Sequence, residues 1–215
     1  MKSSTFHRLV AVAATAAAFA LPAAPAQATT LLEFTGETVN AVFTAGSQQT
    51  CHDPIMLPWL ATSLDLGLYF PVPGGSFEDS TAGWQLTGGA SVAPGSSTIA
   101  ALGIGTASLR IPAGATATSP SFCVDERYPH FRFFLTGTAD ADVAVVYPGL
   151  EGPNVRAATT LDATSRWRLS PRVGLEPTYG TEYGGWRLVA LRFKGKGAGG
   201  STLRVDDVLV DPKMR

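Results

Sequence analysis

Side chains able to perform nucleophilic or acid–base chemistry are few in this chain. Beyond residue 28 the histidines are His52 and His130, and the cysteines are Cys51 and Cys123. His52 beside Cys51 would suit a thiolate nucleophile with its base, but only a reduced cysteine can attack. His130 stands at the start of an expected strand, where a surface histidine is the ordinary interpretation. No Gly-x-Ser-x-Gly or His-Glu-x-x-His motif accompanies them.

Neighbouring carboxylates offer a second chemistry, because glycoside hydrolysis needs two carboxyl groups at a fixed separation. The candidate pairs are Glu78-Asp79, Asp125-Glu126, Asp140 with Asp142, and Asp206-Asp207. The spacing does not show which pair converges, and most carboxylates of a folded chain are solvated or lie in turns. We therefore expect no enzyme, with a glycan-active hydrolase as an alternative.

The first 28 residues have the form of an export signal. Lys2 and Arg8 precede an apolar run from Leu9 to Leu21, and Ala26-Gln27-Ala28 suits cleavage. The mature chain is predicted to start at Thr29 and to be secreted. No other segment approaches the roughly 18 consecutive apolar residues of a membrane helix, so we expect no membrane insertion.

Export also decides the state of the two cysteines. Oxidation outside the cell and an even count predict one disulfide, Cys51–Cys123. In the chain-entropy model a loop of about 70 residues gives roughly 4 kcal/mol of stability. The exported chain is slightly acidic, which argues against sequence-independent nucleic-acid binding.

Charge is unevenly distributed along the exported chain. Residues 29–109 contain six acids and no Lys or Arg, whereas the basic residues begin at Arg110. The simplest interpretation is that Ser and Thr occupy the exposed faces of the first half, without a steering role for charge.

Short segments rich in β-branched and aromatic residues recur between Gly, Pro, Ser and Asp, with 23 Gly and 15 Pro in the chain. This pattern predicts a β-sandwich or barrel. The clearest strands are expected at Thr106–Ile111, Phe131–Gly137, Ala141–Tyr147, Arg166–Leu169, Trp186–Phe193 and Thr202–Val210.

Alternation assigns the faces of these strands. The predicted core side includes Leu109, Ile111, Phe131, Phe133 and Leu135, together with Trp167 and Leu169. The strand from Trp186 to Phe193 is largely apolar on both sides, which predicts a central position covered on both faces. Residues 29–72 are less regular, and their prolines exclude a continuous helix or central strand, so we expect an N-terminal arm there.

Two short motifs carry a resemblance. The run Pro73-Gly74-Gly75-Ser76-Phe77-Glu78 with Gly83-Trp84, closed by Leu203 to Val208, resembles family-4/9 and family-22 carbohydrate-binding modules over about residues 73–211. The resemblance implies a galactose-binding-like jelly roll over 73–215, with Trp84 in its core. A wider resemblance, through Leu57-Pro58-Trp59-Leu60 and Ser121-Phe122-Cys123, is to uncharacterised secreted actinobacterial proteins.

The same resemblance implies a structural calcium ion. Glu78 matches the acid after the opening Phe, and Asp206 or Asp207 matches the closing acid pair. Carboxylate oxygens suit this hard cation, but six or more oxygens are required. The alternative is that Glu78 lies in a turn while one of the aspartates meets an arginine.

Sugar contact is expected from exposed aromatic rings, which stack on the apolar face of a pyranose. Tyr179 and Tyr183, in a Gly-rich loop, are the candidates. Arg132, Arg166 and Arg168 would line a face suited to an acidic polysaccharide, unless they form a solvated arginine surface.

Together these features predict a secreted, monomeric, non-catalytic module that binds a polysaccharide or cell-envelope glycan. The alternative is a structural or protein-interaction domain at the cell surface, which would expose a sizeable apolar patch.

Overall fold

The computed structural model describes residues 51–78, 83–99, 101–103, 105–148 and 152–212. The predicted signal peptide, residues 1–28, and the first part of the arm lie outside the described residues, as does the side chain of Tyr183. The described residues belong to one compact unit, residues 39–215. Within the described ranges no helix is long and apolar enough to cross a membrane.

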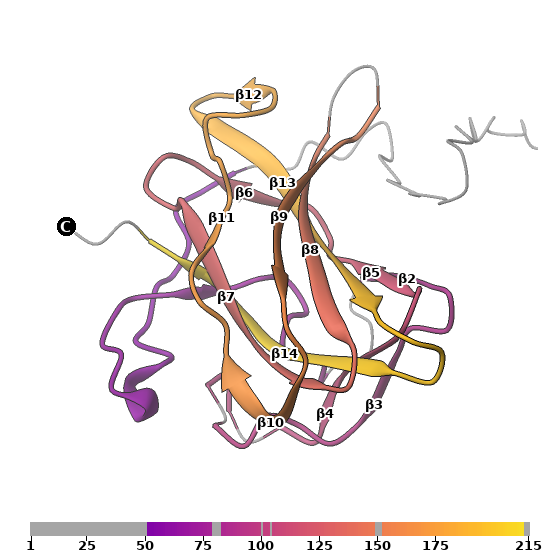
Figure 1. Cartoon of the computed structure of the whole chain (residues 1–215). Coiled ribbons are helices and arrows are strands. Elements are labelled where there is room, and N and C mark those ends of the chain that lie inside the picture. The colour runs from indigo at the N-terminus through magenta and orange to yellow at the C-terminus, as the bar shows by residue number, and fades with distance from the viewer. Residues whose placement is uncertain (1–50, 79–82, 100, 104, 149–151, 213–215) are drawn as a thin grey trace, which may run out of the picture. The chain divides into compact units, whose positions relative to one another are not determined.

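The first sheet has the strand order β10-β7-β14-β4-β3 (Figure 1). Two short strands extend it, because β1 pairs with β14 and β11 pairs with β7. Its strands are β1 (Phe70–Pro71), β3 (Ser91–Pro94), β4 (Ala107–Pro112), β7 (His130–Gly137), β10 (Thr164–Leu169), β11 (Val173–Gly174) and β14 (Thr202–Asp211).

The second sheet has the order β2-β5-β13-β8-β9, and β6 and β12 also pair with β13. Its strands are β2 (Gln85–Thr87), β5 (Thr116–Thr118), β6 (Phe122–Val124), β8 (Asp140–Tyr147), β9 (Asn154–Leu161), β12 (Glu182–Tyr183) and β13 (Trp186–Lys196). The chain passes between the two sheets repeatedly, for example between β2 and β3, between β7 and β8, and between β13 and β14. This is the jelly-roll β-sandwich that the sequence predicted.

The main core fills the space between the sheets. Phe131, Phe133 and Leu135 of β7 face Val189, Leu191 and Phe193 of β13, and Leu109 and Ile111 of β4 join them. Trp84 is 5% exposed there, and its Nε1 donates to the Pro73 carbonyl at 3.0 Å. Alternation therefore assigned the inner faces of β4 and β7 correctly.

A second, smaller cluster lies on the outer face of the first sheet. Phe134 and Leu209 point outward from β7 and β14, and they pack with Leu60 and Tyr69 of the arm. Trp167 and Leu169 belong to this cluster and do not face the main core as expected. The reason is register: Leu169 pairs with the outward Phe134.

The six expected strands are present with ends shifted by three residues at most, and β13 is central. The eight-residue strand β9 was not predicted. It lies at the sheet edge and many of its side chains are exposed, so it lacks the apolar alternation that marks a half-buried strand.

Candidate functional site

Two rows of mostly polar side chains cross the outer face of the second sheet. Register places one inward row at Leu86, Ala117, Phe193, Val143 and Thr159, which pair across the five strands. The positions on either side of this row must point away from the core. They are Gln85, Thr118, Arg192, Ala144 and Ala157 in one row, and Thr87, Thr116, Lys194, Asp142 and Thr160 in the other. We call these two rows the polar face.

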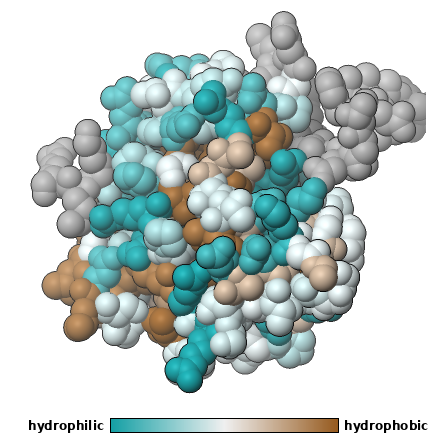
Figure 2. All heavy atoms as spheres, in the orientation of Figure 1, coloured by the Kyte–Doolittle hydropathy of each residue, from teal (hydrophilic) through white to brown (hydrophobic). Residues whose placement is uncertain are grey.

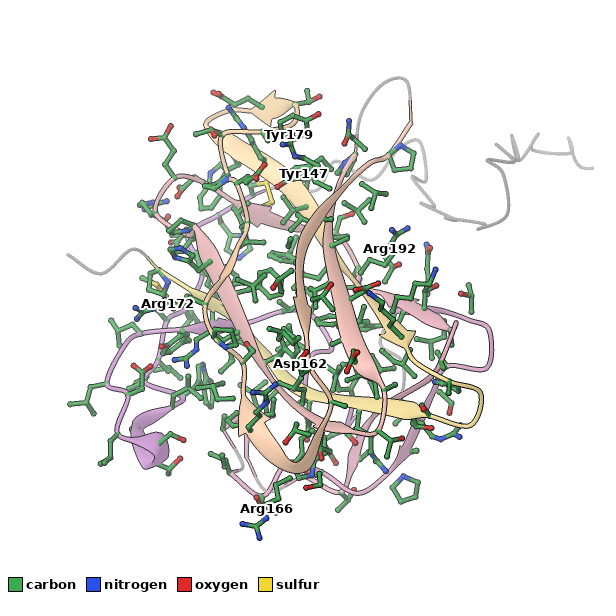
Figure 3. The ribbon with its side chains drawn as sticks, in the orientation of Figure 1. Tyr147, Asp162, Arg166, Arg172, Tyr179 and Arg192 are labelled. Carbon is green, nitrogen blue, oxygen red and sulfur yellow. A yellow bond between two sulfur atoms is a disulfide. The ribbon has the colours of Figure 1, made fainter. Side chains whose placement is uncertain are left out.

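Hydrogen bonds between strands orient the second row. The hydroxyl oxygens of Thr87 and Thr116 lie 2.5 Å apart, and the Thr160 hydroxyl donates to Asp142 at 2.6 Å. Arg192 projects from the sheet on the side away from Arg172 (Figure 3). The polar face thus presents hydroxyl, amide, carboxylate and cationic groups on a hydrogen-bonded backbone.

Sequence reasoning missed the polar face, although a signal for part of it was there. Thr116 and Thr118 flank the buried Ala117, and Arg192 and Lys194 flank the buried Phe193. The strands β2 and β5 are only three residues long, too short to show a period by themselves.

The structure places Tyr179 against another ring. Its centroid is 4.8 Å from that of the buried Tyr147, edge to face, and the two side chains lie together in Figure 3. The Arg156 guanidinium lies 4.3 Å from the Tyr179 centroid and pairs with Glu176 at 3.0 Å. Asn154 donates to the Tyr179 hydroxyl at 2.9 Å. Tyr179 is therefore half-buried, with a cation over its ring, and Tyr183 lies in β12.

The three predicted arginines do not share one face. Arg132 lies on the outer face of the first sheet, where Nη1 pairs with Asp65 at 2.8 Å and Nε and Nη2 donate to the Ser170 carbonyl. Arg168 pairs with Leu135, whose side chain points into the core, so Arg168 lies on the opposite side of the sheet. Arg166 is exposed and points away from the molecule in Figure 3.

The predicted calcium ligands hold a loop in place. Residues 95–106 connect β3 to β4, and Ile99, Ala101 and Leu102 of this connection pack on the outer face of the first sheet. The Asp206 carboxylate accepts from the Ser97 N–H at 2.6 Å, and Asp207 accepts from the Ala101 N–H at 3.0 Å. Asp207 has a φ of 44°, in a bulge of β14 between Asp206 and Leu209, so both side chains reach the loop.

Glu78 anchors the far end of the same loop. Its carboxylate accepts from the N–H groups of Thr106 and Ala107 at 2.9 and 3.0 Å, and from the Thr106 hydroxyl at 3.0 Å. A Cβ at Gly105 would lie 2.5 Å from Glu78 Oε1, so a larger residue there would displace the Glu78 carboxylate. Burial opposes ionisation of Glu78, but the hydrogen bonds together outweigh it and hold its pKa below the usual value.

For Asp206 and Asp207, in contrast to Glu78, burial outweighs the hydrogen bonds and the pKa values are raised. Desolvation raises the pKa of Asp206 to about 6 and that of Asp207 to about 7, and the charges of the neighbouring carboxylates add to both shifts. The residues are 1% and 4% exposed. They lie beneath the loop, where a polysaccharide has no access to them.

The acid cluster, as placed, fits protein donors better than calcium. N–H groups occupy oxygens of Glu78, Asp206 and Asp207, and a cation would have to displace these hydrogen bonds. Within the described ranges no group of three or more His, Cys, Asp and Glu side chains is arranged to hold a metal ion. Calcium stays a prediction.

A disulfide and an ion cluster fasten the start of the arm. Cys51 and Cys123 are bonded, with Cα atoms 5.7 Å apart, as predicted. Arg127 pairs with Asp53 and Asp125 at 2.6 Å each, and its guanidinium lies 5.3 Å from the centroid of the Trp186 ring. Because Cys51 is oxidised, it is not a nucleophile.

Comparisons with known proteins found solved structures alone. No family model matches the chain, and no curated protein matches its sequence. The CBM22-1 xylan-binding domain of Paenibacillus barcinonensis is similar, with 16% identity and a TM-score of 0.43 over 64% of this chain and 91% of that one.

Two further structures are similar to this chain. The N-terminal cellulose-binding domain of Cellulomonas fimi β-1,4-glucanase C has 20% identity and a TM-score of 0.43 over 68% of this chain and 99% of that one. The CBM22-1–GH10 modules of a Clostridium thermocellum endo-1,4-β-D-xylanase have 16% identity and a TM-score of 0.47, over 67% of this chain and 29% of that one. The likeness is one of fold.

Proposed function

We propose that the chain is a secreted, non-catalytic module that binds a polysaccharide or cell-envelope glycan through the polar face. The observation that carries the proposal is the pair of in-register polar rows on the outer face of the second sheet. Neighbouring strands lie about 4.8 Å apart and alternate residues of one strand lie roughly 6.7 Å apart. The rows therefore form a regular grid of hydrogen-bonding groups.

A grid of this kind suits a ligand with many hydroxyl groups. Each sugar hydroxyl can donate and accept, and the face offers both partners through Thr118, Gln85 and Asp142. The strands hold these groups before a ligand arrives, which lowers the entropy cost of binding. Small side chains, Ala144 and Ala157, continue the first row.

The placement of the acids supports binding in preference to hydrolysis. Asp206 and Asp207 have raised pKa values, as a general acid would, but both are buried under the 95–106 loop and hydrogen-bond to its backbone. Glu78 is engaged by three donors of the same loop. These three carboxylates therefore hold the loop on the first sheet.

The test is affinity electrophoresis of residues 29–215 in native gels containing neutral or acidic polysaccharides, with calcium present. We expect one glycan class to slow the chain. The double variant Gln85→Ala/Thr118→Val should weaken this binding at least tenfold, because it removes two hydrogen-bonding groups from one row.

The matched control changes exposed polar residues of the first sheet. Ser165→Ala/Arg166→Ala in β10 should bind as the unchanged chain does. Tyr179→Ala tests the site predicted from the sequence. Failure of every glycan to slow the chain, or full retention of binding by Gln85→Ala/Thr118→Val, would overturn the proposal, and loss in Tyr179→Ala alone would move the site to that tyrosine.

A further inference from the structure

Large apolar side chains are exposed along one segment of the arm. Leu64 is 93% exposed, Ile55 82%, Leu66 78%, Leu68 46% and Leu57 43%. Figure 2 shows hydrophobic side chains gathered at the lower left, over the segment that carries the 3-10 helix η1 (Ala61–Ser63) in Figure 1. We call residues 55–68 the leucine loop.

The leucine loop is held firmly at its base. Leu57 and Tyr69 exchange backbone hydrogen bonds of 2.9 and 2.8 Å, and Leu60 and Tyr69 are fully buried in the second cluster. Asp65 accepts the Tyr69 hydroxyl at 2.7 Å and pairs with Arg132. The segment that carries the exposed leucines is therefore anchored, and their exposure is not a consequence of poor packing.

Leu64 shows that this exposure costs stability. It ends η1 with a φ of 61°, in the left-handed region that disfavours a leucine side chain. Asn or Gly would adopt this backbone more easily and would be more soluble. A leucine there contributes to neither the backbone nor the core, which points to a role in contact with something outside the chain.

Charge on the leucine loop indicates an uncharged partner surface. Between residues 54 and 77 the one charged residue is Asp65, whose carboxylate is already paired with Arg132 at 2.8 Å. Residues 51–109 as a whole contain acids and no Lys or Arg. An anionic surface would be repelled by this half of the chain.

Shape favours a deformable surface as the partner. The exposed side chains are Ile55, Leu57, Leu64, Leu66 and Leu68. The loop projects from the sandwich in Figure 1, and a projection fits a deformable surface without a matching groove.

Many backbone groups of the loop are already hydrogen-bonded. Backbone N–H groups that would be costly to dehydrate already bond within the loop or its base. They belong to Leu57, Trp59, Ala61, Ser63, Leu64, Asp65, Gly67 and Tyr69. Apolar side chains can therefore enter a lipid interface without stranding these donors.

From these observations we propose that the leucine loop is a lipid-contacting element, which places Leu64, Leu66 and Leu68 in the interface of a zwitterionic lipid surface. The contact is peripheral and differs from the spanning segment that the sequence excludes. Five apolar side chains give weak, reversible attachment, comparable to that of a single acyl chain. The polar face lies on the other sheet and is not needed for this contact.

The test is co-sedimentation of residues 29–215 with vesicles of pure phosphatidylcholine. Residues 1–28 are omitted because their apolar run would itself bind lipid, and the described residues lie in a compact unit without them. We expect binding that is unchanged between low and high salt. Adding phosphatidylserine should not strengthen it, because the loop half of the chain is acidic.

Two matched double variants isolate the apolar contact. Leu66→Ser/Leu68→Ser should bind at least tenfold more weakly, whereas Leu66→Met/Leu68→Met should bind within about twofold of the unchanged chain. Leu64→Asn should melt at or above the temperature of the unchanged chain, because Asn accepts the left-handed backbone, yet bind about tenfold more weakly. Loss of binding is then separate from loss of folding.

Three results would overturn the proposal. One is no binding of the unchanged chain to phosphatidylcholine, and another is binding that requires phosphatidylserine. The third is a dimer in sedimentation velocity that Leu66→Ser/Leu68→Ser dissolves, which would assign the loop to a second copy of the chain.

Discussion

The outer faces of the two sheets follow the same alternation, but other parts of the chain cover the first face, whereas the second carries mostly polar side chains. On the first sheet the outward positions include Phe134 and Leu209, both fully buried, because the arm and the 95–106 loop fold over them. On the second sheet the outward rows are mostly Thr, Gln, Arg, Lys and Asp. The described residues place no comparable apolar cluster there.

The difference shows that the outward residues of a sandwich determine whether a face is covered by other parts of the chain. Phe134 and Leu209 are outward apolar side chains on neighbouring strands, and other segments of the chain cover them. Those covering segments need hydrogen-bond partners for their own backbone. Asp206, Asp207 and Glu78 supply those partners. Where the outward positions are polar, water or a ligand with hydroxyl groups can satisfy them, and the face is suited to binding.

The largest expected effect comes from removing the apolar contact beneath the cover. Phe134→Ala should lower the free energy of unfolding by about 3–5 kcal/mol, because a fully buried ring leaves a cavity under the arm. Thr160→Ala on the polar face should cost less than about 1 kcal/mol. Urea denaturation measures both changes, and equal losses would mean that the two faces do not differ in this way.

A smaller effect is expected from the buried acids under the loop. Their folded pKa values, about 6 and about 7, exceed that of an unfolded aspartate, so the folded state binds more protons between about pH 4 and 7. Stability should therefore rise as the pH falls, by about 2–3 kcal/mol from pH 8 to pH 5.5. Below about pH 4.5 the trend should reverse, because the lowered pKa values of Glu78 and Asp65 mark stability lost on protonation.

Asp207→Asn should remove most of this pH dependence, and unfolding at several pH values in the presence of chelator checks it. A flat profile in the unchanged chain would contradict the burial of the ionised pair. Adding calcium at pH 8 tests the predicted ion in the same assay, because a bound cation would favour the ionised carboxylates and raise the melting temperature. No change on adding calcium would remove that prediction.

The sequence predicted the sandwich because its longest strands carry a clear period. Phe131, Phe133 and Leu135 alternate with polar or outward residues, and a central β13 followed from apolar residues on both sides. The short strands β2 and β5 and the exposed edge strand β9 lack such a signal. Since the polar face spans these three strands, the sequence could not assemble it.

Register explains the remaining differences. The bulge at Asp207 shifts the alternation in β14, so Val205 and Val208, three positions apart, both face the main core and Leu209 faces outward. Arg132 and Arg168 lie on opposite sides because β10 pairs with a shifted register. Neither the bulge nor the shift has a local sequence signal. The apolar arm was recognised from its prolines, but its outward leucines follow from how the arm is anchored.

The smallest effect separates two ion pairs that fasten the arm. Asp65→Asn should cost about 1 kcal/mol, because it breaks a half-buried pair with Arg132 and weakens the bond from Tyr69. Asp53→Asn breaks a shorter pair with Arg127, but the Asp53 side chain is 71% exposed, so its effect should stay within about 0.5 kcal/mol. The comparison uses the same substitution in the same arm, and the two pairs differ in burial and in the hydrogen bonds that Asp65 also accepts from Tyr69 and Gly67. Proteolysis within residues 57–69 should accelerate in Asp65→Asn alone, since that carboxylate holds the cover on the first sheet. Equal effects of the two variants would mean that the arm is held by its apolar contacts and the disulfide, and that charge contributes little to covering this face.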